Sequence, residues 1–245
     1  MTPLDVLCVG ATPGEVQIVD ASLGGARQGR GGVRPWRWGR VGELRVGVLA
    51  CGVGKANAAL ALGPVLEAVR PRLVLALGVA GAYPGSGLAV GQAAVAAEEI
   101  YGDEGVETPR GFRGMEQTSL PLWEDGRVRH FNRFPADPGV NAVLAGCGSG
   151  AARLGIGPFV TLSTVTGTRE RALELERRYA ALCETMEGAA IAHAAAAYGA
   201  AFGEVRGVSN PVGPRDRASW KIPEAAAAAQ NVALRFLHSW PARRT

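Results

Sequence analysis

The sequence predicts an α/β fold with three layers, in which helices cover both faces of a central mixed, mostly parallel sheet. Short apolar runs that end at glycine or proline alternate along the chain with longer segments of helical periodicity, the order typical of parallel strands joined by helices. Hydrophobic residues make up 47% of the 245 residues, which is enough for a large core. We expect residues 1–245 to form one domain, because α/β folds of this length often do not divide.

The first half of the chain is predicted to alternate strands with a helix. Residues 4–9 are an apolar run that ends at Gly10, and residues 44–51 alternate before Gly52. Residues 55–69 have helical periodicity, which Pro71 stops. Residues 73–97 contain no charged residue, but glycines and a turn-forming run interrupt them. We therefore expect two strands, 73–77 and 92–100, rather than a membrane span.

The second half begins with a polar segment rich in proline and glycine, residues 102–138, which we expect to be a long loop region and a candidate cover for a site. A charged helix and a buried, Ala-rich helix closed by Gly199 follow, and a final amphipathic helix ends the chain. The predicted strands here are residues 157–163 and 204–209, and the predicted helices are residues 169–182, 186–198 and 223–240.

The composition argues against several classes of function. The net charge is +4, but no dense basic run with interleaved aromatic residues occurs, so we expect no nucleic-acid partner. We also expect no membrane partner, and the N-terminus lacks the pattern of a signal peptide. The four cysteines are scattered and none has the spacing of a metal site or a redox pair, which indicates a reducing, cytoplasmic location and no metal.

Two stretches place polar groups among apolar residues. Glu187 is predicted to lie inside the Ala-rich helix, where an unpaired buried carboxylate is costly unless it has a function or an unseen partner. Arg206 and Asn210 belong to a run that is predicted to be a buried strand and its end. Together these residues suggest a small-molecule site at the carboxyl end of a sheet strand.

Three shorter motifs have ordinary structural interpretations when taken alone. The run from Gly52 to Asn57 fits neither nucleotide-binding fingerprint, so a tight strand-to-helix turn is favoured. The glycines at 78 and 81 indicate either a tight turn or room for a flat ligand to approach the backbone, and the two readings are equally favoured. Glu15 fits an acid in the first turn of a helix.

The order and spacing of these motifs resemble those of the nucleoside phosphorylase and nucleosidase superfamily, over nearly the whole chain and most weakly over residues 100–150. The resemblance is closest to the methylthioadenosine/S-adenosylhomocysteine nucleosidases. It implies that Glu15 orients and activates an attacking water, that Glu187 accepts hydrogen bonds from ribose hydroxyls, and that Arg206 lies beside that water or near Glu15. Asn210 would face the imidazole edge of a purine and Met186 the sugar, and the remaining candidate substrate contacts are Val79, Gly81, Val165, Thr166, Ser209, Arg215 and Arg217.

Two departures from the superfamily pattern narrow the expected reaction. The glycine turn before Val79 lacks the arginine and hydroxyl with which the phosphorylases hold phosphate, so we expect water as the nucleophile. Asn210 stands where adenine-cleaving members have aspartate, and an amide can donate to a 6-oxo group while its carbonyl accepts a hydrogen bond from N7–H. We therefore expect hydrolysis of a 6-oxopurine nucleoside.

Residues 209–217 resemble those of the futalosine hydrolases, which release hypoxanthine on a route to menaquinone. Arg215, Arg217 or Lys221 would then pair the carboxylate at the 5′ side of the substrate, with arginine the better partner. The alternatives are a methylthioadenosine-type nucleosidase, a 6-oxopurine phosphorylase, and a non-catalytic nucleoside-binding protein. We expect no cofactor, and a homo-oligomer because relatives complete the pocket with residues of a neighbour.

Overall fold

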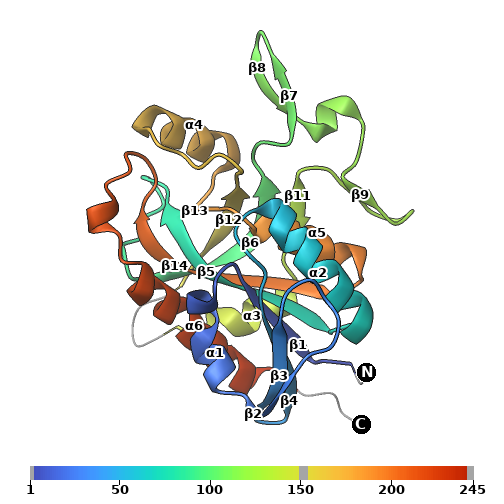
Figure 1. Ribbon diagram of the computed structural model, residues 1–245. Coiled ribbons are helices and arrows are strands. Elements are labelled where there is room, and N and C mark those ends of the chain that lie inside the picture. Colours follow the sequence, from blue (N-terminus) through green and yellow to red (C-terminus); the bar gives the residue numbers. More distant parts are fainter. Residues whose placement is uncertain (1–2, 149–153, 242–245) are drawn as a thin grey trace.

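The computed structural model describes residues 3–148 and 154–241 (Figure 1). Its main sheet has 10 strands: β1 (Val6–Gly10), β2 (Gly24–Gln28), β3 (Trp36–Val41), β4 (Leu44–Ala50), β5 (Leu73–Ala82), β6 (Ala93–Tyr101), β11 (Arg133–Pro135), β12 (Gly155–Thr161), β13 (Cys183–Thr185) and β14 (Ala201–Pro211). The helices are η1 (Pro13–Glu15), α1 (Gln17–Ala21), α2 (Lys55–Val69), η2 (Met115–Thr118), α3 (Pro138–Ala145), α4 (Arg169–Tyr179), α5 (Gly188–Ala197), η3 (Arg217–Ser219) and α6 (Ile222–Ser239).

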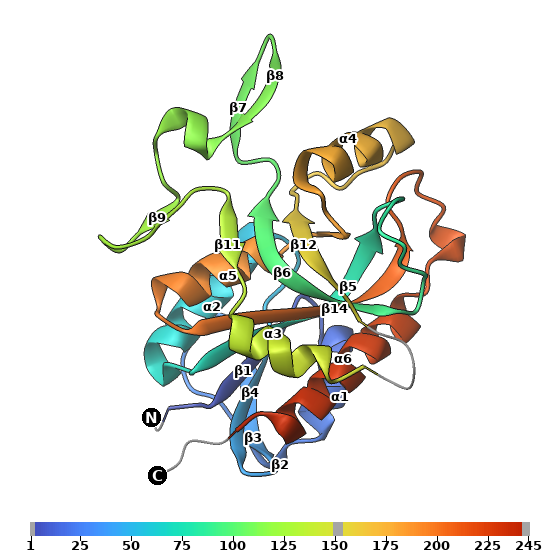
Figure 2. The same cartoon turned by 180° about the vertical axis from the view of Figure 1, so that it is seen from behind.

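Helices lie on both faces of the sheet, as predicted (Figures 1 and 2). Alternate residues of β1 divide between two hydrophobic clusters: Leu7 and Val9 pack with α2 and α5, and Val6 and Cys8 pack with α6, α3 and α1. This alternation follows from the two-residue period of a strand, which turns neighbouring side chains to opposite faces. The three-layer α/β prediction is confirmed.

The sheet is mixed, and its two longest ladders are parallel: β5 with β14, and β12 with β6. The pairings β5–β13, β13–β12, β12–β6, β6–β14 and β14–β5 close a ring of strands, which alternation alone did not predict. On one edge of β5, β1 pairs residues 73–76 and β13 pairs residues 81–82. The ladder on this edge is therefore interrupted between Leu77 and Ala80.

Several predicted boundaries are corrected. The Gly78 segment is not a turn, because β5 runs through it to Ala82. The charged helix ends at Tyr179, where Ala180 adopts a left-handed conformation. A short strand, β13, follows, so the Ala-rich helix begins only at Gly188 and Glu187 occupies its N-cap position rather than its interior. The turn from Gly52 to Gly54 is confirmed, with φ of 93° at both glycines.

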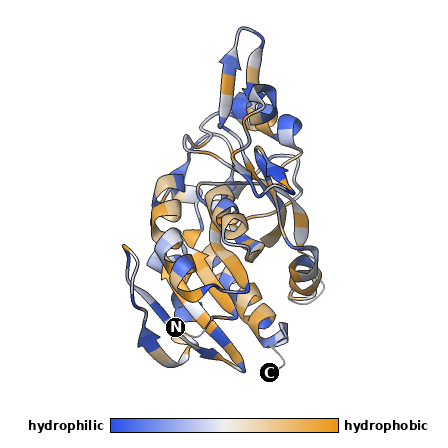
Figure 3. Cartoon of the chain, turned by 90° about the vertical axis from the view of Figure 1, so that its right-hand side faces the viewer, coloured by the Kyte–Doolittle hydropathy of each residue, from blue (hydrophilic) through white to orange (hydrophobic). Residues whose placement is uncertain are grey.

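The segment 102–138 is more ordered than a loop, and it contains the hairpins β7 (Gly105–Thr108) with β8 (Gly111–Gly114) and β9 (Trp123–Glu124) with β10 (Arg129–His130). The β7–β8 hairpin projects from the body of the molecule (Figures 1 and 2). Figure 3 shows that hydrophobic residues concentrate on the central strands and the helices against them, and that the projecting hairpin is largely hydrophilic. Among the described residues, no helix combines the length and apolar character needed to cross a membrane.

Candidate active site

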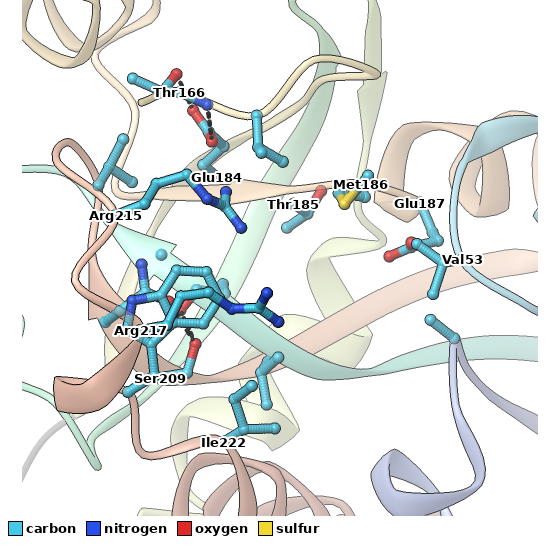
Figure 4. Close-up of a pocket in the computed structure, with 18 of the residues that line it drawn as sticks. Val53, Thr166, Glu184, Thr185, Met186, Glu187, Ser209, Arg215, Arg217 and Ile222 are labelled. Atoms are coloured by element: carbon cyan, nitrogen blue, oxygen red, sulfur yellow. Dashed lines mark hydrogen bonds between the residues drawn. The ribbon is translucent and has the colours of Figure 1, made fainter. Parts of the chain in front are cut away.

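A cavity of about 500 Å³ opens beside the carboxyl-terminal halves of β5 and β14 (Figure 4). Its walls come from segments far apart in the sequence: the loop after β1, the turn before α2, β5, the loop after β12, β13 and the loop after β14. Every predicted site residue except Arg206 lines it: Glu15, Val79, Gly81, Val165, Thr166, Met186, Glu187, Ser209, Asn210, Arg215 and Arg217. No residue of 102–138 lines it, so the expected cover over the site is not formed by this segment in the single chain.

Glu15 is held on the cavity wall by three hydrogen bonds. Its Oε2 accepts from the backbone N–H of Thr12 at 2.8 Å and from the Thr12 hydroxyl at 3.0 Å. Its Oε1 accepts from the Val79 N–H at 3.0 Å, which is free because the β5 ladder is interrupted there. Glu15 is thus both the capping acid of η1 and a carboxylate fixed beside the cavity, with a side chain that is 7% exposed.

Arg206 lies behind the cavity wall, in the middle of β14, with a side chain that is 1% exposed. Its Nη1 is 4.0 Å from Glu15 Oε1 and 3.9 Å from Glu187 Oε2, so one guanidinium faces both carboxylates. Gly78 makes this approach possible, because a Cβ at that position would lie only 2.5 Å from Arg206 Nη1 and would overlap Glu15. The guanidinium therefore places a positive charge next to both carboxylates but does not line the cavity.

Glu187 is held from the opposite side. Its Oε1 accepts a hydrogen bond of 2.7 Å from the N–H of Gly54, in the turn that precedes α2. Burial raises the pKa of Glu187 above its ordinary value, and the charge of Arg206 partly opposes that shift. The buried Glu187 carboxylate therefore has two partners that could not be identified from the sequence, the Arg206 guanidinium and the Gly54 N–H.

The end of β14 brings Ser209 and Asn210 to the cavity. The Ser209 hydroxyl donates to Asn210 Oδ1 at 2.8 Å, and Asn210 Nδ2 donates to the Pro211 carbonyl at 2.8 Å. The second N–H of the amide remains available for a ligand. Gly81 pairs with Asn210 across the β5–β14 ladder. A Cβ at this position would lie 2.8 Å from Val212, so glycine leaves space beside the Asn210 amide.

Thr166 is fixed to a carboxylate that the sequence did not single out. Glu184, on β13, accepts from the Thr166 N–H at 2.8 Å and from its hydroxyl, and also from Tyr83 at 3.1 Å (Figure 4). Burial raises the pKa of Tyr83, and the charge of Glu184 adds to that shift. Glu184 thereby sets the position of the loop that carries Val165 and Thr166.

Arg215 and Arg217 extend over the cavity from the loop after β14 (Figure 4). Both guanidinium groups lie against the ring of Trp220, at 4.8 Å and 5.9 Å from its centroid. Stacking on an indole face orients a guanidinium while its N–H groups stay free for an anion. Lys221, the third cation considered from the sequence, does not line the cavity.

Trp220, Glu184 and Val53 are among the lining residues that sequence reasoning missed; the others are Ala11, Thr12, Ala80, Thr185, Val212, Gly213 and Ile222. Glu184 gave a usable signal, since it is an acid in an apolar run directly before the motif of Met186 and Glu187. Trp220 gave a weaker signal, as an aromatic residue in an arginine-rich loop. No group of three or more potential metal ligands occurs in the part of the chain that the structure describes.

The arrangement has a definite chemical capacity. Two buried carboxylates face the same cavity on either side of a single guanidinium, so the site favours positive charge that develops between them. Each carboxylate can accept from a hydroxyl or a water. Elsewhere on the wall, the Asn210 amide can form hydrogen bonds with the edge of a heterocycle, and Arg215 and Arg217 can bind an anion.

A model of the phosphorylase superfamily matches residues 5–238 of this chain. The futalosine hydrolase of Thermus thermophilus is 40% identical over 77% of this chain and 80% of that protein. The futalosine hydrolase of Streptomyces coelicolor is 41% identical over 79% of this chain and 80% of that protein. A solved structure of the S-adenosylhomocysteine nucleosidase from Streptococcus pyogenes superposes with a TM-score of 0.84 at 22% identity, covering 99% of both chains, and shows the shared fold.

Proposed function

This chain belongs to the phosphorylase superfamily and is an N-glycosyl hydrolase of nucleosides, and we propose that its substrate is futalosine, from which it releases hypoxanthine. The observation that carries the proposal is the convergence of Glu15 and Glu187 on one cavity beside Arg206, with Asn210 on the same wall. Breaking an N-glycosidic bond makes the sugar cationic and the base anionic. The two carboxylates and the amide match these two developing charges.

In the proposed mechanism, Glu187 accepts hydrogen bonds from the ribose hydroxyls, and Met186 packs on the sugar. Glu15 orients a water toward the anomeric carbon and takes its proton, while Arg206 keeps both carboxylates in place. Three hydrogen bonds to Glu15 support this role, because a base must be fixed within reach of the proton that it takes.

Water is the proposed nucleophile. The Val79 N–H, which an oxyanion would need, is donated to Glu15, and the Val79 side chain offers no donor. The arginines that line the cavity, Arg215 and Arg217, come from the loop after β14 rather than from the glycine segment. This distribution of donors favours hydrolysis over phosphorolysis.

Asn210 is proposed to read the purine. When the departing base takes up a proton at N7, the Asn210 carbonyl can accept a hydrogen bond from N7–H, and the unused N–H of the amide can donate to a 6-oxo oxygen, whereas a 6-amino group would not accept that hydrogen bond. Val165 and Thr166 would lie beside the base, with Thr166 held by Glu184.

Arg215 or Arg217 is proposed to pair the carboxylate at the 5′ side of futalosine, with Trp220 holding the guanidinium. Inosine has the same base and sugar but no such carboxylate. Replacing the arginine that pairs this carboxylate by glutamine should therefore raise KM for futalosine and leave KM for inosine unchanged. Equal KM changes for both nucleosides would contradict this assignment.

One assay tests the reaction itself. The enzyme is given futalosine, inosine or methylthioadenosine, each with and without inorganic phosphate, and the released base and sugar are identified. We expect hypoxanthine and a free sugar from futalosine at a rate that does not depend on phosphate. A sugar 1-phosphate would favour the phosphorylase alternative, and preferred release of adenine would favour a methylthioadenosine-type nucleosidase.

Three further expectations belong to the same proposal. We propose that the enzyme works as a homo-oligomer in the cytoplasm and that residues 1–245 act as one domain. Residues 102–138, which we expected to cover the site, do not line the cavity in the single chain. This supports a contribution to the site from a neighbouring subunit. The molar mass in solution, measured by light scattering, tests the oligomer.

A further inference from the structure

A second pair of acids lies behind the cavity and takes no part in the mechanism above. Glu99 on β6 and Glu204 on β14 are both 0% exposed, and neither lines the cavity. Their carboxyl groups meet beneath Gly188, the first residue of α5. A Cβ at Gly188 would overlap Glu99 Oε1 and would lie 2.8 Å from Glu204 Oε1, so only glycine leaves room for the pair.

Hydrogen bonds connect Glu99 to the start of α5. The Thr161 hydroxyl donates to Glu99 Oε2 at 2.7 Å, and the Thr185 hydroxyl donates to Glu99 Oε1 at 3.1 Å. The Ala189 N–H in turn donates to the Thr161 hydroxyl oxygen at 2.8 Å. Glu99 is therefore part of the framework that places Glu187, the residue directly before α5.

Glu204 is connected to Arg206. Its Oε1 accepts a hydrogen bond of 2.6 Å from Arg206 Nε, and this contact leaves Nη1 facing Glu15 and Glu187. Glu204 Oε2 and Arg206 Nη2 have no protein partner within residues 3–148 and 154–241. The contact at Nε thus fixes the direction of a guanidinium whose other nitrogens are only loosely held.

The charges explain why two acids are present. Four buried carboxyl groups surround one guanidinium, and low-dielectric surroundings disfavour ionisation of all four. Burial, together with the charge of Glu204, raises the pKa of Glu99 well above its ordinary value of 4.5. The raised pKa of Glu99 favours its protonated form, and the guanidinium contacts Glu204 rather than Glu99.

We propose that Glu204 is a positioning residue for Arg206 in this hydrolase, and that neutral Glu99 donates the hydrogen bond that keeps Glu204 charged and in place. The inference rests on the proposed function, because the groups that Arg206 orients are the two carboxylates of the mechanism. Glu204 does not line the cavity. It acts through the guanidinium, and it also adds negative charge near a sugar that becomes cationic.

The central test is the variant Glu204→Gln, which keeps the shape and removes the charge. A displaced Arg206 is expected to lower kcat/KM for futalosine by about 10²-fold, the effect of a small misplacement at a reacting centre. Glu98→Gln is the matched control, on the same strand as Glu99 but paired with Arg133 at the surface, and it should not change kcat/KM. Glu99→Gln should cost at least tenfold less than Glu204→Gln, because glutamine reproduces a neutral donor.

The pH profile separates positioning from simple support of the fold. Glu187 is faced by Glu15 from η1, by Arg206 and Glu204 from β14, by the Gly54 N–H, and by the Cys51 thiol, whose pKa burial raises to about 12. The charge of Glu204 raises the pKa of Glu187. Its loss should therefore move the acid limb of kcat/KM to lower pH, whereas Glu204→Asp should lower the rate and leave that limb in place.

The double variant Glu204→Gln/Arg206→Gln completes the test. If Glu204 acts only through Arg206, then Glu204→Gln should cause no further loss in an Arg206→Gln background. An equal loss in both backgrounds, an unshifted acid limb, or equal losses for Glu99→Gln and Glu204→Gln would each overturn the inference. If wild-type protein releases no base from futalosine or inosine, the proposed function itself has failed. Glu204→Asp with wild-type kcat would overturn the inference even if Glu204→Gln did not fold.

Discussion

Gly78→Ala is the sharpest perturbation of the site, because one methyl group would enter the space between Glu15 and Arg206. The new Cβ would lie 2.5 Å from Arg206 Nη1 and 3.1 Å from Glu15 Cδ. Both side chains are long, but both are buried and held by hydrogen bonds, Glu15 by Thr12 and Val79 and Arg206 by Glu204. They cannot move away without breaking the arrangement that the mechanism needs.

The magnitude follows from two sources. Overpacking of a filled interior costs about 1–3 kcal/mol. The φ of 154° at Gly78 is a conformation that other residues rarely adopt, and it adds about 1–3 kcal/mol. The sum of about 2–6 kcal/mol corresponds to a fall in Tm of roughly 5–20 °C for a chain of this size. Displacement of the two charged groups should also lower kcat/KM by about 10²-fold.

Thermal unfolding and steady-state hydrolysis of futalosine measure the two effects. Gly63→Ala is the matched control, because Gly63 lies inside α2 and a Cβ there would meet its nearest neighbour, the Tyr198 hydroxyl, at 3.7 Å. This variant should change the free energy of unfolding by less than about 1 kcal/mol, because the preference of alanine for a helix is opposed by crowding of its Cβ against Pro64. Wild-type Tm and activity for Gly78→Ala would refute the assigned close approach.

Four further variants test individual groups. Glu15→Gln should lower kcat by about 10²-fold or more with little change in substrate binding, and Glu187→Gln should impair both, as measured by kinetics and by the Kd of a non-hydrolysed analogue. Asn210→Asp should lower the ratio of kcat/KM for futalosine to that for its 6-amino analogue at neutral pH, since a carboxylate repels the 6-oxo oxygen; an unchanged ratio would mean that Asn210 only ties the end of β14 to Pro211. Because the pKa of Glu99 is higher in the folded than in the unfolded protein, wild type should lose stability relative to Glu99→Gln as pH rises above 4.5, and parallel curves in denaturant titrations across pH would contradict that shift.

Local sequence patterns predicted much of the sheet and the helices on it. The bounds of α2 match residues 55–69, since glycine before the helix and proline after it mark both ends. The short strand β13 was missed because its three residues have no periodicity, and only pairing with β5 and β12 defines it. The closed ring of strands has the same origin, since pairings between distant segments leave no local pattern.

The candidate site also contains residues that the sequence could identify and residues that it could not. Glu15, Glu187 and Arg206 could be selected from motifs, and the structure brings all three together. Glu99 and Glu204 could not be selected, because an isolated glutamate in an apolar run does not reveal which distant charge it faces. Their meeting beneath Gly188 depends on the register of β6 against β14 and on the start of α5.

The interruption of the β5 ladder also gives the molecule an internal reporter. Leu75 and Ala76 lie within a strand paired on both edges, so their amides exchange hydrogen with solvent only when the sheet opens. The Val79 amide is instead covered by the carboxylate of Glu15. Its rate of deuterium uptake therefore measures how firmly that carboxylate is held in the resting enzyme, before any substrate binds.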